Sequence, residues 1–336
     1  MSKYYSTDTK KTMKELGKEK LLENLDLMLM IRNFETRAES AYLQGKVGGF
    51  FHAYTGQEAI QTAAVAACGK KNWWIASYRC HALALLLGAT PKELMAELYG
   101  KAAGNAKGRG GSMHLYTERL LGGFGIVAGQ IPCAIGAAFA LKYKKIKDEV
   151  ALCFLGDGAV AQGAFHESLN MAALWDLPCI FVIENNKWGM GTAVERAISV
   201  KRLAEDKAPG YGIKGYTFDG KDFLACYAGF KHVFEEVKKT GRPVLVEAIC
   251  ERFKGHSISD PGLYRTKDEL KEIKKQDPIL HLLHDLMEEK IIDEDGFKER
   301  DKMFRQQMIE TLAYADECEW PDPEELEKDV FAGEGQ

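Results

Sequence analysis

Two short polar motifs near the middle of the chain have residue types that could bind a metal ion. A Gly-Asp-Gly turn at 156–158 and a Glu-Asn-Asn turn at 184–186 place Asp157 and Asn186 29 residues apart. Carboxylate and amide oxygens suit a hard divalent cation such as Mg²⁺, which completes its coordination with water and substrate phosphates. Each motif alone could be an ordinary polar turn, so the interpretation depends on whether the fold brings the two together.

The elements that would position these motifs are two short strands and the helix between them. Val150–Leu155 and Cys179–Ile183 are too short for helices and are typical of strands buried on both faces. Ala161–Asp176 is predicted to be a helix. A strand, a helix and a strand in this length form a βαβ unit, whose strands are parallel. Asp157 and Asn186 should therefore lie at the same sheet edge, where open α/β sheets bind ligands.

Two further features expected at this edge are suited to phosphate. The helix Ala161–Asp176 follows Gly158 and Ala159 and would point its N-terminus at the same edge, and a helix N-terminus attracts anions. Tyr78 and Arg79 follow directly on Trp73–Ser77, another predicted strand. The arginine side chain offers a fork of donors that matches phosphate geometry. A solvent-exposed arginine is the alternative, and the position after a strand favours the binding role.

Helix and strand patterns continue on both sides of this unit. Tyr216–Phe218 and Val244–Ile249 are predicted strands, and 222–239 is a predicted helix between them. We therefore expect an α/β fold in which helices cover both faces of a parallel sheet, with helical N- and C-terminal extensions. Residues 1–17 are predicted to form a mobile tail, and residues 18–336 a single domain with a helical C-terminal tail.

Helix signals and a glycine-rich region fill the first half of the chain. Capping-box patterns predict helices that start at Thr55 and at Thr90. Further predicted helices are Lys18–Leu43 and Ile131–Lys145. The glycine-rich residues 104–129 could form a flexible linker. Glycine is also required where the backbone closely approaches a ligand or a neighbouring subunit, so this second interpretation stays open.

The composition argues against several classes of function. A net charge of −4 gives no reason to expect a nucleic-acid partner. The longest apolar run, Ile131–Leu141, is too short to span a bilayer. The eight cysteines show no C-x-x-C spacing, which favours reduced thiols over a metal or disulfide framework. The lysine-rich residues 1–20 lack the apolar centre of a secretory signal. We therefore expect a cytoplasmic protein without a nucleic-acid or membrane partner.

The two central motifs together resemble the thiamine diphosphate-binding motif, in which Gly-Asp-Gly is followed at this distance by Asn-Asn. The sequence from Asn170 to Thr192 is similar to alpha subunits of the thiamine diphosphate-dependent 2-oxo acid dehydrogenases, in particular their pyruvate dehydrogenase branch. The resemblance extends over about residues 20–325. It implies a Mg²⁺ ion that is held by Asp157, Asn186 and the backbone carbonyl of Trp188 and that bridges the cofactor diphosphate.

The resemblance also implies a set of cofactor-binding residues in segments that match family motifs. These residues are His52, Tyr78, Arg79, Gly125, Val127, Asp157, Gly158, Ala159, Asn186 and His256. His52 and His256 are the histidines implied to take part in catalysis. The sequence departs from the family pattern at Phe124, where relatives often have Asn, and at Lys254, where mitochondrial relatives have a second His. Ser257 matches one of the serines phosphorylated in those relatives.

The two histidine segments can also be interpreted without the resemblance. His52 lies among aromatic residues, where a histidine is usually a core residue, and His256 lies in Glu251–Lys267, where it is usually solvated. The latter segment is charged, contains Gly255 and Gly262, and has few apolar anchors. We expect a mobile loop that becomes ordered when a diphosphate binds.

By resemblance, the chain is expected to be an alpha subunit of a pyruvate dehydrogenase decarboxylase component. Such enzymes decarboxylate pyruvate with thiamine diphosphate and pass the acetyl unit to the lipoyl domain of a dihydrolipoyl acyltransferase. The resemblance further implies that a beta subunit supplies the activating glutamate in an α2β2 heterotetramer. An alpha subunit for branched-chain 2-oxo acids or acetoin is the alternative. A nucleotide-binding Rossmann-like protein is a remote alternative, because no G-x-G-x-x-G follows a first strand.

Overall fold

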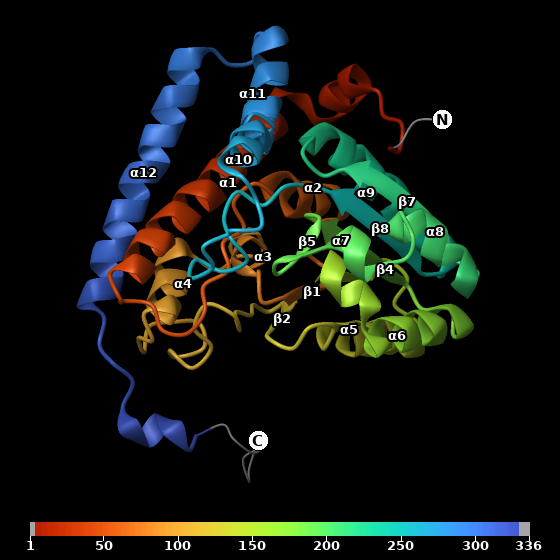
Figure 1. Ribbon diagram of the computed structural model, residues 1–336, viewed down its shortest axis with the longest axis horizontal. Helices are drawn as coiled ribbons and strands as arrows, with labels where there is room; N and C mark the ends of the chain where they lie inside the picture. The colour runs from red at the N-terminus through yellow and green to blue at the C-terminus, as the bar shows by residue number, and fades with distance from the viewer. Residues whose placement is uncertain (1–3, 329–336) are drawn as a thin grey trace.

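A six-stranded parallel sheet forms the centre of the molecule (Figure 1), a computed structural model that describes residues 4–328. The strand order is β2-β1-β3-β4-β8-β7. The strands are β1 (Trp73–Ser77), β2 (Leu120–Phe124), β3 (Ala151–Gly156), β4 (Cys179–Asn185), β7 (Lys214–Asp219) and β8 (Val244–Ile249). The predicted βαβ unit consists of β3, α6 (Gly163–Leu174) and β4, and its strands pair directly in parallel. The carboxyl ends of β1, β3, β4 and β8 therefore meet along one edge.

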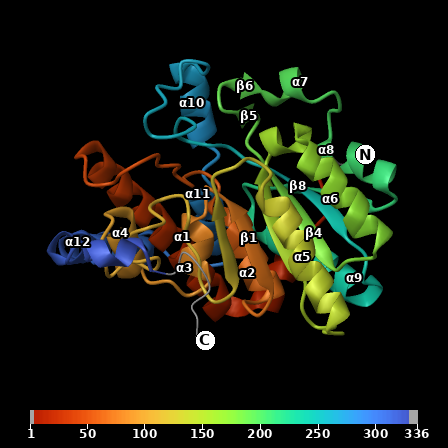
Figure 2. The same ribbon diagram turned by 90° about the horizontal axis from the view of Figure 1, so that it is seen from below.

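Helices cover both faces of the sheet, as predicted (Figure 2). One face packs against α5 (Gln130–Tyr143), α6 and α8 (Leu203–Lys207), and the other against α2 (Glu58–Cys68) and α9 (Phe223–Thr240), which are backed by α1 (Thr9–Leu43). Successive strand residues enter opposite cores: Trp74 and Phe154 belong to the core on the side of α2 and α9, whereas Ile75 and Leu155 belong to the core on the side of α5 and α6. Burial on both faces explains the continuous apolar runs in the sequence.

The C-terminal residues form a helical extension, as expected. α10 (Lys267–Lys274) and α11 (Pro278–Glu288) follow the sheet, and α12 (Glu294–Glu317) runs along α1 and α4 (Pro91–Leu98) at one side of the domain (Figure 1). Several short elements were not predicted from the sequence. They are α3 (His81–Leu86), the antiparallel hairpin β5 (Trp188–Gly189) and β6 (Thr192–Ala193), α7 (Val194–Ala197), α8, and the 3-10 turns η1 (Asp157–Ala161), η2 (Ala208–Tyr211) and η3 (Pro323–Leu326).

The two capping-box patterns have different outcomes. Thr90 caps α4 in a complete capping box, as predicted. Thr55 does not cap α2, which begins only at Glu58. The Glu58 carboxylate instead accepts the backbone N–H of Gly56 and pairs with the guanidinium of Arg32. A tertiary ion pair has therefore replaced the local cap that the sequence pattern predicts.

The N-terminal segment differs from the free tail that its composition predicts. The first helix begins at Thr9 and not at Lys18, with Asp8 as its N-cap, and it is kinked at Gly17, where φ is 74°. Ahead of the helix, the ring of Tyr5 stacks on His232 of α9 at 5.1 Å. The described part of this segment thus packs on the domain. Residues 1–3 of the predicted tail and residues 329–336 of the predicted domain lie outside the described residues.

The first part of the glycine-rich region, residues 104–111, is ordered around one buried carboxylate. Glu97 of α4 accepts hydrogen bonds from the backbone N–H groups of Ala106 and Gly108 at one oxygen, at 2.8 and 2.9 Å. Its other oxygen accepts the N–H groups of Gly110 and Gly111, at 2.7 and 3.1 Å. Four donors on one carboxylate hold the backbone in a defined loop, so the linker interpretation is not supported here.

The second part of the glycine-rich region, residues 112–129, contains a strand that was not predicted from the sequence. Its residues Leu120–Phe124 form the edge strand β2, which pairs in parallel with β1. The two glycines of the Leu-Leu-Gly-Gly-Phe sequence weaken its strand signal. A Cβ on Gly123 would lie 2.4 Å from the carbonyl oxygen of Met113, so close backbone packing requires glycine there.

Within residues 4–328, no helix combines the length and the apolar character needed to cross a bilayer. All eight cysteines fall in this range as free thiols, six of them buried. The prediction of reduced thiols agrees with this arrangement.

Candidate active site

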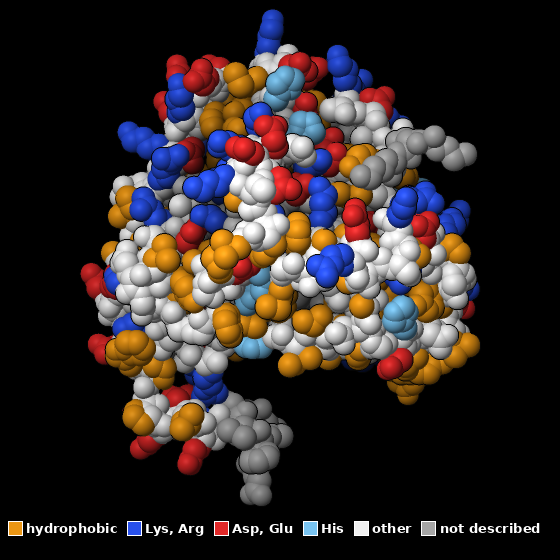
Figure 3. Space-filling model, in the orientation of Figure 1, with side chains coloured by type: hydrophobic (Ala, Val, Ile, Leu, Met, Phe, Trp, Pro, Cys, Tyr) orange, Lys and Arg blue, Asp and Glu red, His pale blue; other side chains and the backbone are white. Residues whose placement is uncertain are grey.

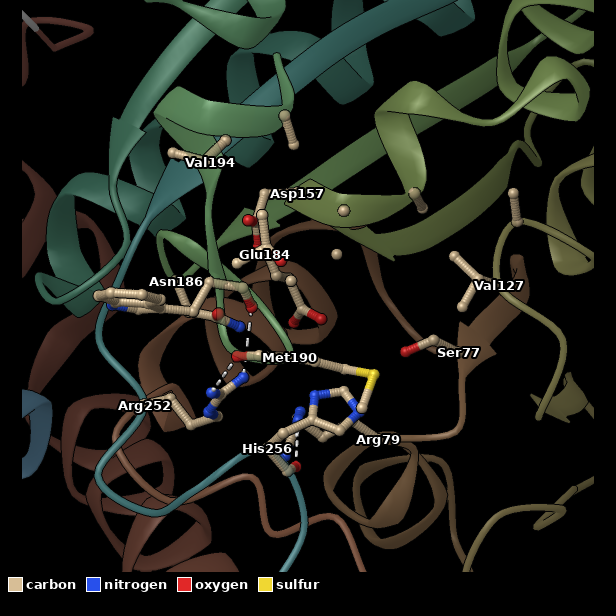
Figure 4. Close-up of a pocket in the computed structure, with 18 of the residues that line it drawn as sticks. Ser77, Arg79, Val127, Asp157, Glu184, Asn186, Met190, Val194, Arg252 and His256 are labelled. Carbon is tan, nitrogen blue, oxygen red and sulfur yellow. Dashed lines mark hydrogen bonds between the residues drawn. The ribbon is translucent and has the colours of Figure 1, made fainter. Parts of the chain in front are cut away.

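A cavity of about 330 Å³ lies at the carboxyl edge of the sheet (Figure 4). Its polar side chains follow the ends of neighbouring strands: Arg79 after β1, Asp157 after β3, Asn186 after β4 and Arg252 after β8. Of the predicted cofactor and metal residues, the lining includes Tyr78, Arg79, Val127, Asp157, Gly158, Ala159, Asn186, Trp188 and His256. The fold therefore brings most of the predicted residues to one place.

Asp157 and Asn186 present oxygen atoms that the rest of the protein leaves unpaired. Both side chains are buried. Within the described part of the chain, Oδ2 of Asp157 and Oδ1 of Asn186 have no hydrogen-bond partner. Burial raises the pKa of the Asp157 carboxyl to about 6, although Arg252 opposes the shift. Buried oxygens without partners are suited to a divalent cation, and this donor set fits Mg²⁺.

The first asparagine of the Asn-Asn turn has a structural role. Nδ2 of Asn185 donates to Glu247 at 2.7 Å, and its Oδ1 accepts the backbone N–H of Lys187 at 2.9 Å. Lys187 has a φ of 71°, a conformation that this side-chain cap stabilises. Asn185 thus holds the turn from which Asn186 faces the cavity. The sequence alone does not distinguish the roles of two adjacent asparagines.

A 3-10 turn that was not predicted from the sequence lies between β3 and the predicted helix. The turn η1 includes Gly158 and Ala159, and α6 starts at Gly163, two residues after the predicted start at Ala161. A Cβ on Gly158 would lie 3.3 Å from the Cα of Gly189. The hairpin β5–β6 can therefore cover the cavity because residue 158 has no side chain.

Two buried arginines border the cavity (Figure 4). Arg79 donates to the carbonyl oxygen of His256 at 3.0 Å. Arg252 donates to the carbonyl oxygens of Trp188 and Met190, each at 3.4 Å. Since a carbonyl oxygen has two lone pairs, that of Trp188 can still accept a metal ion. Sequence reasoning identified Arg79 but assigned Arg252 no site, although Arg252 also lies just past a strand end.

Three aromatic side chains pack together beside Arg79. The His52 ring lies 4.4 Å from that of Tyr78 and 5.0 Å from that of His256. Burial and the charge of Arg79 lower the pKa of His52 to about 2 and that of His256 to about 4. Both imidazoles are therefore neutral near pH 7. His256 and Tyr78 line the cavity, whereas His52 lies behind them and is not among the lining residues.

The segment after β2 reaches the cavity at one of its two predicted residues. Val127 lines the cavity and its side chain is partly exposed. Gly125 is not among the lining residues and lies instead against Met113 and His114, each of which would be 3.3 Å from a Cβ at that position. The backbone role predicted for this segment therefore rests on Val127 in this structure.

Glu184 is a cavity residue that sequence reasoning missed. Its carboxylate accepts hydrogen bonds from the hydroxyl of Tyr54 and from Nε2 of Gln61, the latter at 3.0 Å. Burial raises the pKa of Glu184 to about 7. Its position directly before the Asn-Asn turn was the available signal, but a glutamate in a strand is read as surface-facing by default.

The loop from Glu251 to Lys267 closes one side of the cavity and has more anchors than its composition suggests. The N–H of Phe253 donates to the carbonyl of Thr55, and the N–H of Ile258 to that of Phe51. Ser257 is only 7% exposed, and its hydroxyl lies 2.9 Å from that of Ser259. A kinase could therefore reach Ser257 only after this loop has opened.

Comparison with known proteins adds independent information to this geometry. A family profile described as "Dehydrogenase E1 component" matches residues 26–324. The chain belongs to the dehydrogenase E1 component family. This membership confirms the family resemblance predicted from the central motifs, and the match covers nearly the same residues.

The relatives of this E1 component chain agree in name and in length. It is 40% identical over 316 residues to the pyruvate dehydrogenase E1 component subunit alpha of Rickettsia felis, which covers 94% of this chain and 96% of that protein. Identity to the subunit of the same name from Rhizobium meliloti is 38% over 323 residues, with 95% and 92% covered. Identity to the subunit of the same name from Porphyra purpurea is 37% over 325 residues, with 94% of each chain covered.

Proposed function

We propose that this chain is the alpha subunit of a pyruvate dehydrogenase E1 component, and that it binds thiamine diphosphate through Mg²⁺. The observation that carries the proposal is the pair of unpaired, buried oxygens of Asp157 and Asn186 at adjacent strand ends. The carbonyl of Trp188 is the third proposed ligand. The names of the relatives support pyruvate as the substrate, and no comparison favours the branched-chain, acetoin or Rossmann-like alternatives.

The remaining cavity residues are suited to the diphosphate and to the rest of the cofactor. Arg79 and Arg252 supply positive charge, and the neutral ring of His256 can donate one N–H. His52 would hold Tyr78 and His256 in place from behind. When bound, thiamine diphosphate supplies the carbanion chemistry that decarboxylates a 2-oxo acid. The residues of this chain would bind and orient the diphosphate half.

An apolar surface at the C-terminal ends of α5 and α6, at the sheet edge opposite the cavity, supports a subunit partner. Phe139 and Tyr143 of α5, Leu174 at the end of α6 and Trp175 directly after it are exposed, Tyr143 by 78% and Leu174 by 71%. Figure 3 shows hydrophobic side chains gathered along the lower edge of the molecule, where these helices lie. Apolar patches of this kind mark interaction sites. We assign this surface to the beta subunit of an α2β2 heterotetramer, which would also supply the activating glutamate.

Two further parts of the proposal concern the wider complex and the compartment. The acetyl unit would pass to the lipoyl domain of a dihydrolipoyl acyltransferase, as the family resemblance implies. A cytoplasmic location is supported by the eight free thiols, which are typical of a reducing compartment.

A ligand-dependent melting experiment tests the cofactor assignment. Thiamine diphosphate with Mg²⁺ should raise the melting temperature of the full chain, because a ligand that binds only the native state stabilises it. NAD⁺ is the matched control and should have no effect. A rise with NAD⁺ alone would favour the Rossmann-like alternative and overturn the proposal.

An activity experiment tests the partner and the substrate. The chain isolated from any partner should be nearly inactive with pyruvate and a lipoyl domain, whereas the complex co-purified from native lysate should be active. Robust turnover by the single chain, with no second subunit detected by mass spectrometry, would contradict the alpha-subunit assignment. Faster turnover of branched-chain 2-oxo acids or acetoin by the complex would replace pyruvate as the substrate.

A further inference from the structure

Gln57 lies directly behind one of the two candidate metal ligands. It is the residue before α2, its side chain is fully buried, and it belongs to the cavity lining. Its Oε1 accepts a hydrogen bond from Nδ2 of Asn186 at 3.2 Å and another from Sγ of Cys250 at 3.4 Å. The side chain therefore connects the Asn-Asn turn after β4 to the segment after β8.

The two donors fix which way the Gln57 amide points. Burial raises the pKa of the Cys250 thiol well above its ordinary value, so the thiol keeps its proton and remains a donor. Nδ2 of Asn186 is a donor in any state. If the Gln57 amide were rotated by half a turn, its own N–H groups would face both of these donors. The carbonyl of Gln57 is thus held toward Asn186 and Cys250.

The same hydrogen bond orients the amide of Asn186, and the Cys250 thiol is the donor that holds the Gln57 carbonyl independently of Asn186. Because Nδ2 of Asn186 is engaged with Gln57, Oδ1 must face the opposite way, and within the described residues that oxygen has no partner. An asparagine without such a contact could rotate and present its NH₂ group, which cannot coordinate a cation. Nε2 of Gln57 is itself buried without a partner among the described residues, which leaves its N–H groups for a bound ligand.

The backbone at Gln57 is held in place by contacts that do not involve the cavity. Its N–H donates to the carbonyl of Tyr54 at 3.1 Å. The next residue, Glu58, pairs with Arg32, which also binds Asp277 through two hydrogen bonds at 2.7 and 3.1 Å. These buried contacts fix the turn before α2 independently of the cavity.

We propose that Gln57 positions the metal ligand Asn186 and donates its free Nε2–H to an oxygen of the bound diphosphate. This inference rests on the proposed binding of Mg²⁺ and thiamine diphosphate. It adds a residue to which neither the motif nor the family resemblance assigned a role. Residues that support metal ligands in this way commonly affect metal affinity about as much as a weak ligand does, by ~10- to 100-fold.

Two substitutions separate positioning from direct contact. Gln57→Met removes both the acceptor for Asn186 and the donor to the diphosphate. Gln57→Glu keeps the shape and the acceptor, removes the donor, and adds negative charge beside the diphosphate. Asn33→Leu is the matched control, because Asn33 is a buried amide that bonds to the carbonyl of Leu29 and to Asp301, on helices outside the cavity.

The measurement is isothermal titration calorimetry on the full chain with any subunit that co-purifies. We expect Gln57→Met to raise the half-saturating Mg²⁺ concentration at fixed thiamine diphosphate by about tenfold or more. Gln57→Glu should keep that concentration within about threefold but weaken thiamine diphosphate binding at saturating Mg²⁺ by about tenfold or more. Asn33→Leu should change neither value.

The outcomes distinguish this inference from the function on which it rests. Unchanged Mg²⁺ dependence in Gln57→Met would overturn the positioning role, and unchanged cofactor affinity in Gln57→Glu would overturn the contact with the diphosphate. Equal losses in Asn33→Leu would attribute the effects to general destabilisation and would also overturn the inference. If the unsubstituted protein shows no Mg²⁺-dependent binding, the proposed function itself fails.

Discussion

Burial that disfavours the charged form of a side chain is the feature that distinguishes individual residues at the cavity. Asp157 and Glu184 have raised pKa values, and His52 and His256 have lowered ones, all mainly because the surroundings disfavour the charged form. Perturbed groups that converge on one cavity are typical of functional sites. These four side chains are informative together, because the pKa of each is shifted toward its neutral form at the same place in the molecule.

Removal of the metal ligands should affect cofactor binding and leave the fold intact. Asp157→Ala should abolish Mg²⁺-dependent binding of thiamine diphosphate, because Asp157 is the only charged ligand proposed. Asn186→Ala removes a neutral oxygen and should weaken binding by about tenfold. Asn185→Ala is an instructive comparison, since it should lower thermal stability through loss of the turn. Unchanged Mg²⁺-dependent affinity in Asp157→Ala would falsify the metal assignment.

The depressed pKa of His52 predicts a loss of stability in mild acid. The native state keeps this ring neutral down to a pH of about 2, whereas the unfolded state takes up a proton near pH 6.5. The unfolded state therefore binds more protons below pH 6.5, and stability falls as the pH falls. Relative to His52→Phe without cofactor, the protein should lose about 1.4 kcal/mol between pH 7.5 and 5.5. A pH-independent difference in urea unfolding would contradict this.

At the scale of elements, one carboxylate organises the loop that leads into β2. Glu97 anchors residues 106–111, and the following residue, Ser112, contacts the buried ring of His81, its hydroxyl lying 2.8 Å from Nε2. His114, two residues further on, hydrogen-bonds the carbonyl of Gly123 in β2 at 3.0 Å. The loop thus connects α4 to the edge strand β2 and, through β2, to the cavity segment that follows it.

Substitution of Glu97 should destabilise the whole domain. Glu97→Gln replaces one acceptor oxygen with an NH₂ group that faces two backbone donors, at a cost on the order of 3 kcal/mol. Glu93→Gln on the same helix is the control, because glutamine also forms capping boxes and should cost less than about 0.5 kcal/mol. Urea unfolding of both variants measures the difference. Similar small losses in both would show that the four N–H contacts of Glu97 carry little energy.

At the scale of the whole molecule, α5 connects the cavity to the apolar surface, because it begins at Gln130 in the cavity lining and ends at Tyr143 on that surface. The exposed residues Ile126 and Val127 follow β2, and Val127 also lines the cavity. A partner that covers the apolar surface and extends along α5 to Val127 could therefore also contribute to the site. This arrangement agrees with the proposal that a second subunit contributes to the site.

A charge on the apolar surface should prevent assembly without unfolding the chain. Phe139 packs against the rings of Tyr143 and Trp175 at 6.3 and 5.8 Å and is 47% exposed. Phe139→Asp should weaken association with the co-purifying subunit by about 30-fold or more, with little change in the melting temperature of the isolated chain. Leu280→Asp, at a similarly exposed residue of α11, should leave assembly intact. Equal co-purification of both variants would exclude this surface as the interface.

The sequence predicted the central architecture because strong local signals agree with the fold there. The apolar runs of β3 and β4 are buried on both faces, and the two motifs lie at their ends. The edge strand β2 was missed because its glycines, needed for close packing, remove the strand signal. The start of α1 was misplaced because Gly17 kinks the helix without ending it.

Within the cavity, the missed residues share one physical property. Gln57, Glu184 and Arg252 are polar side chains whose partners come from distant segments. Local patterns report periodicity and turn chemistry, but they do not report which strand ends become neighbours. The candidate metal ligands Asp157 and Asn186 could be identified as neighbours because they follow consecutive strands of one βαβ unit, where chain order and spatial order coincide.

The loop beside the cavity carries internal cross-links with a kinetic consequence. The guanidinium of Arg265 bonds the carbonyls of Arg252 and Lys254, and Arg252 also bonds Lys254, so the two ends of the loop are tied to each other. Such a segment should open as one cooperative unit, and its amide protons should exchange at a shared rate. Thiamine diphosphate should slow that rate uniformly, whereas Arg265→Met should let amides near Gly262 exchange independently. Identical exchange with and without cofactor would mean that the loop takes no part in binding, and a spread of unrelated rates in the unsubstituted protein would mean that it frays residue by residue.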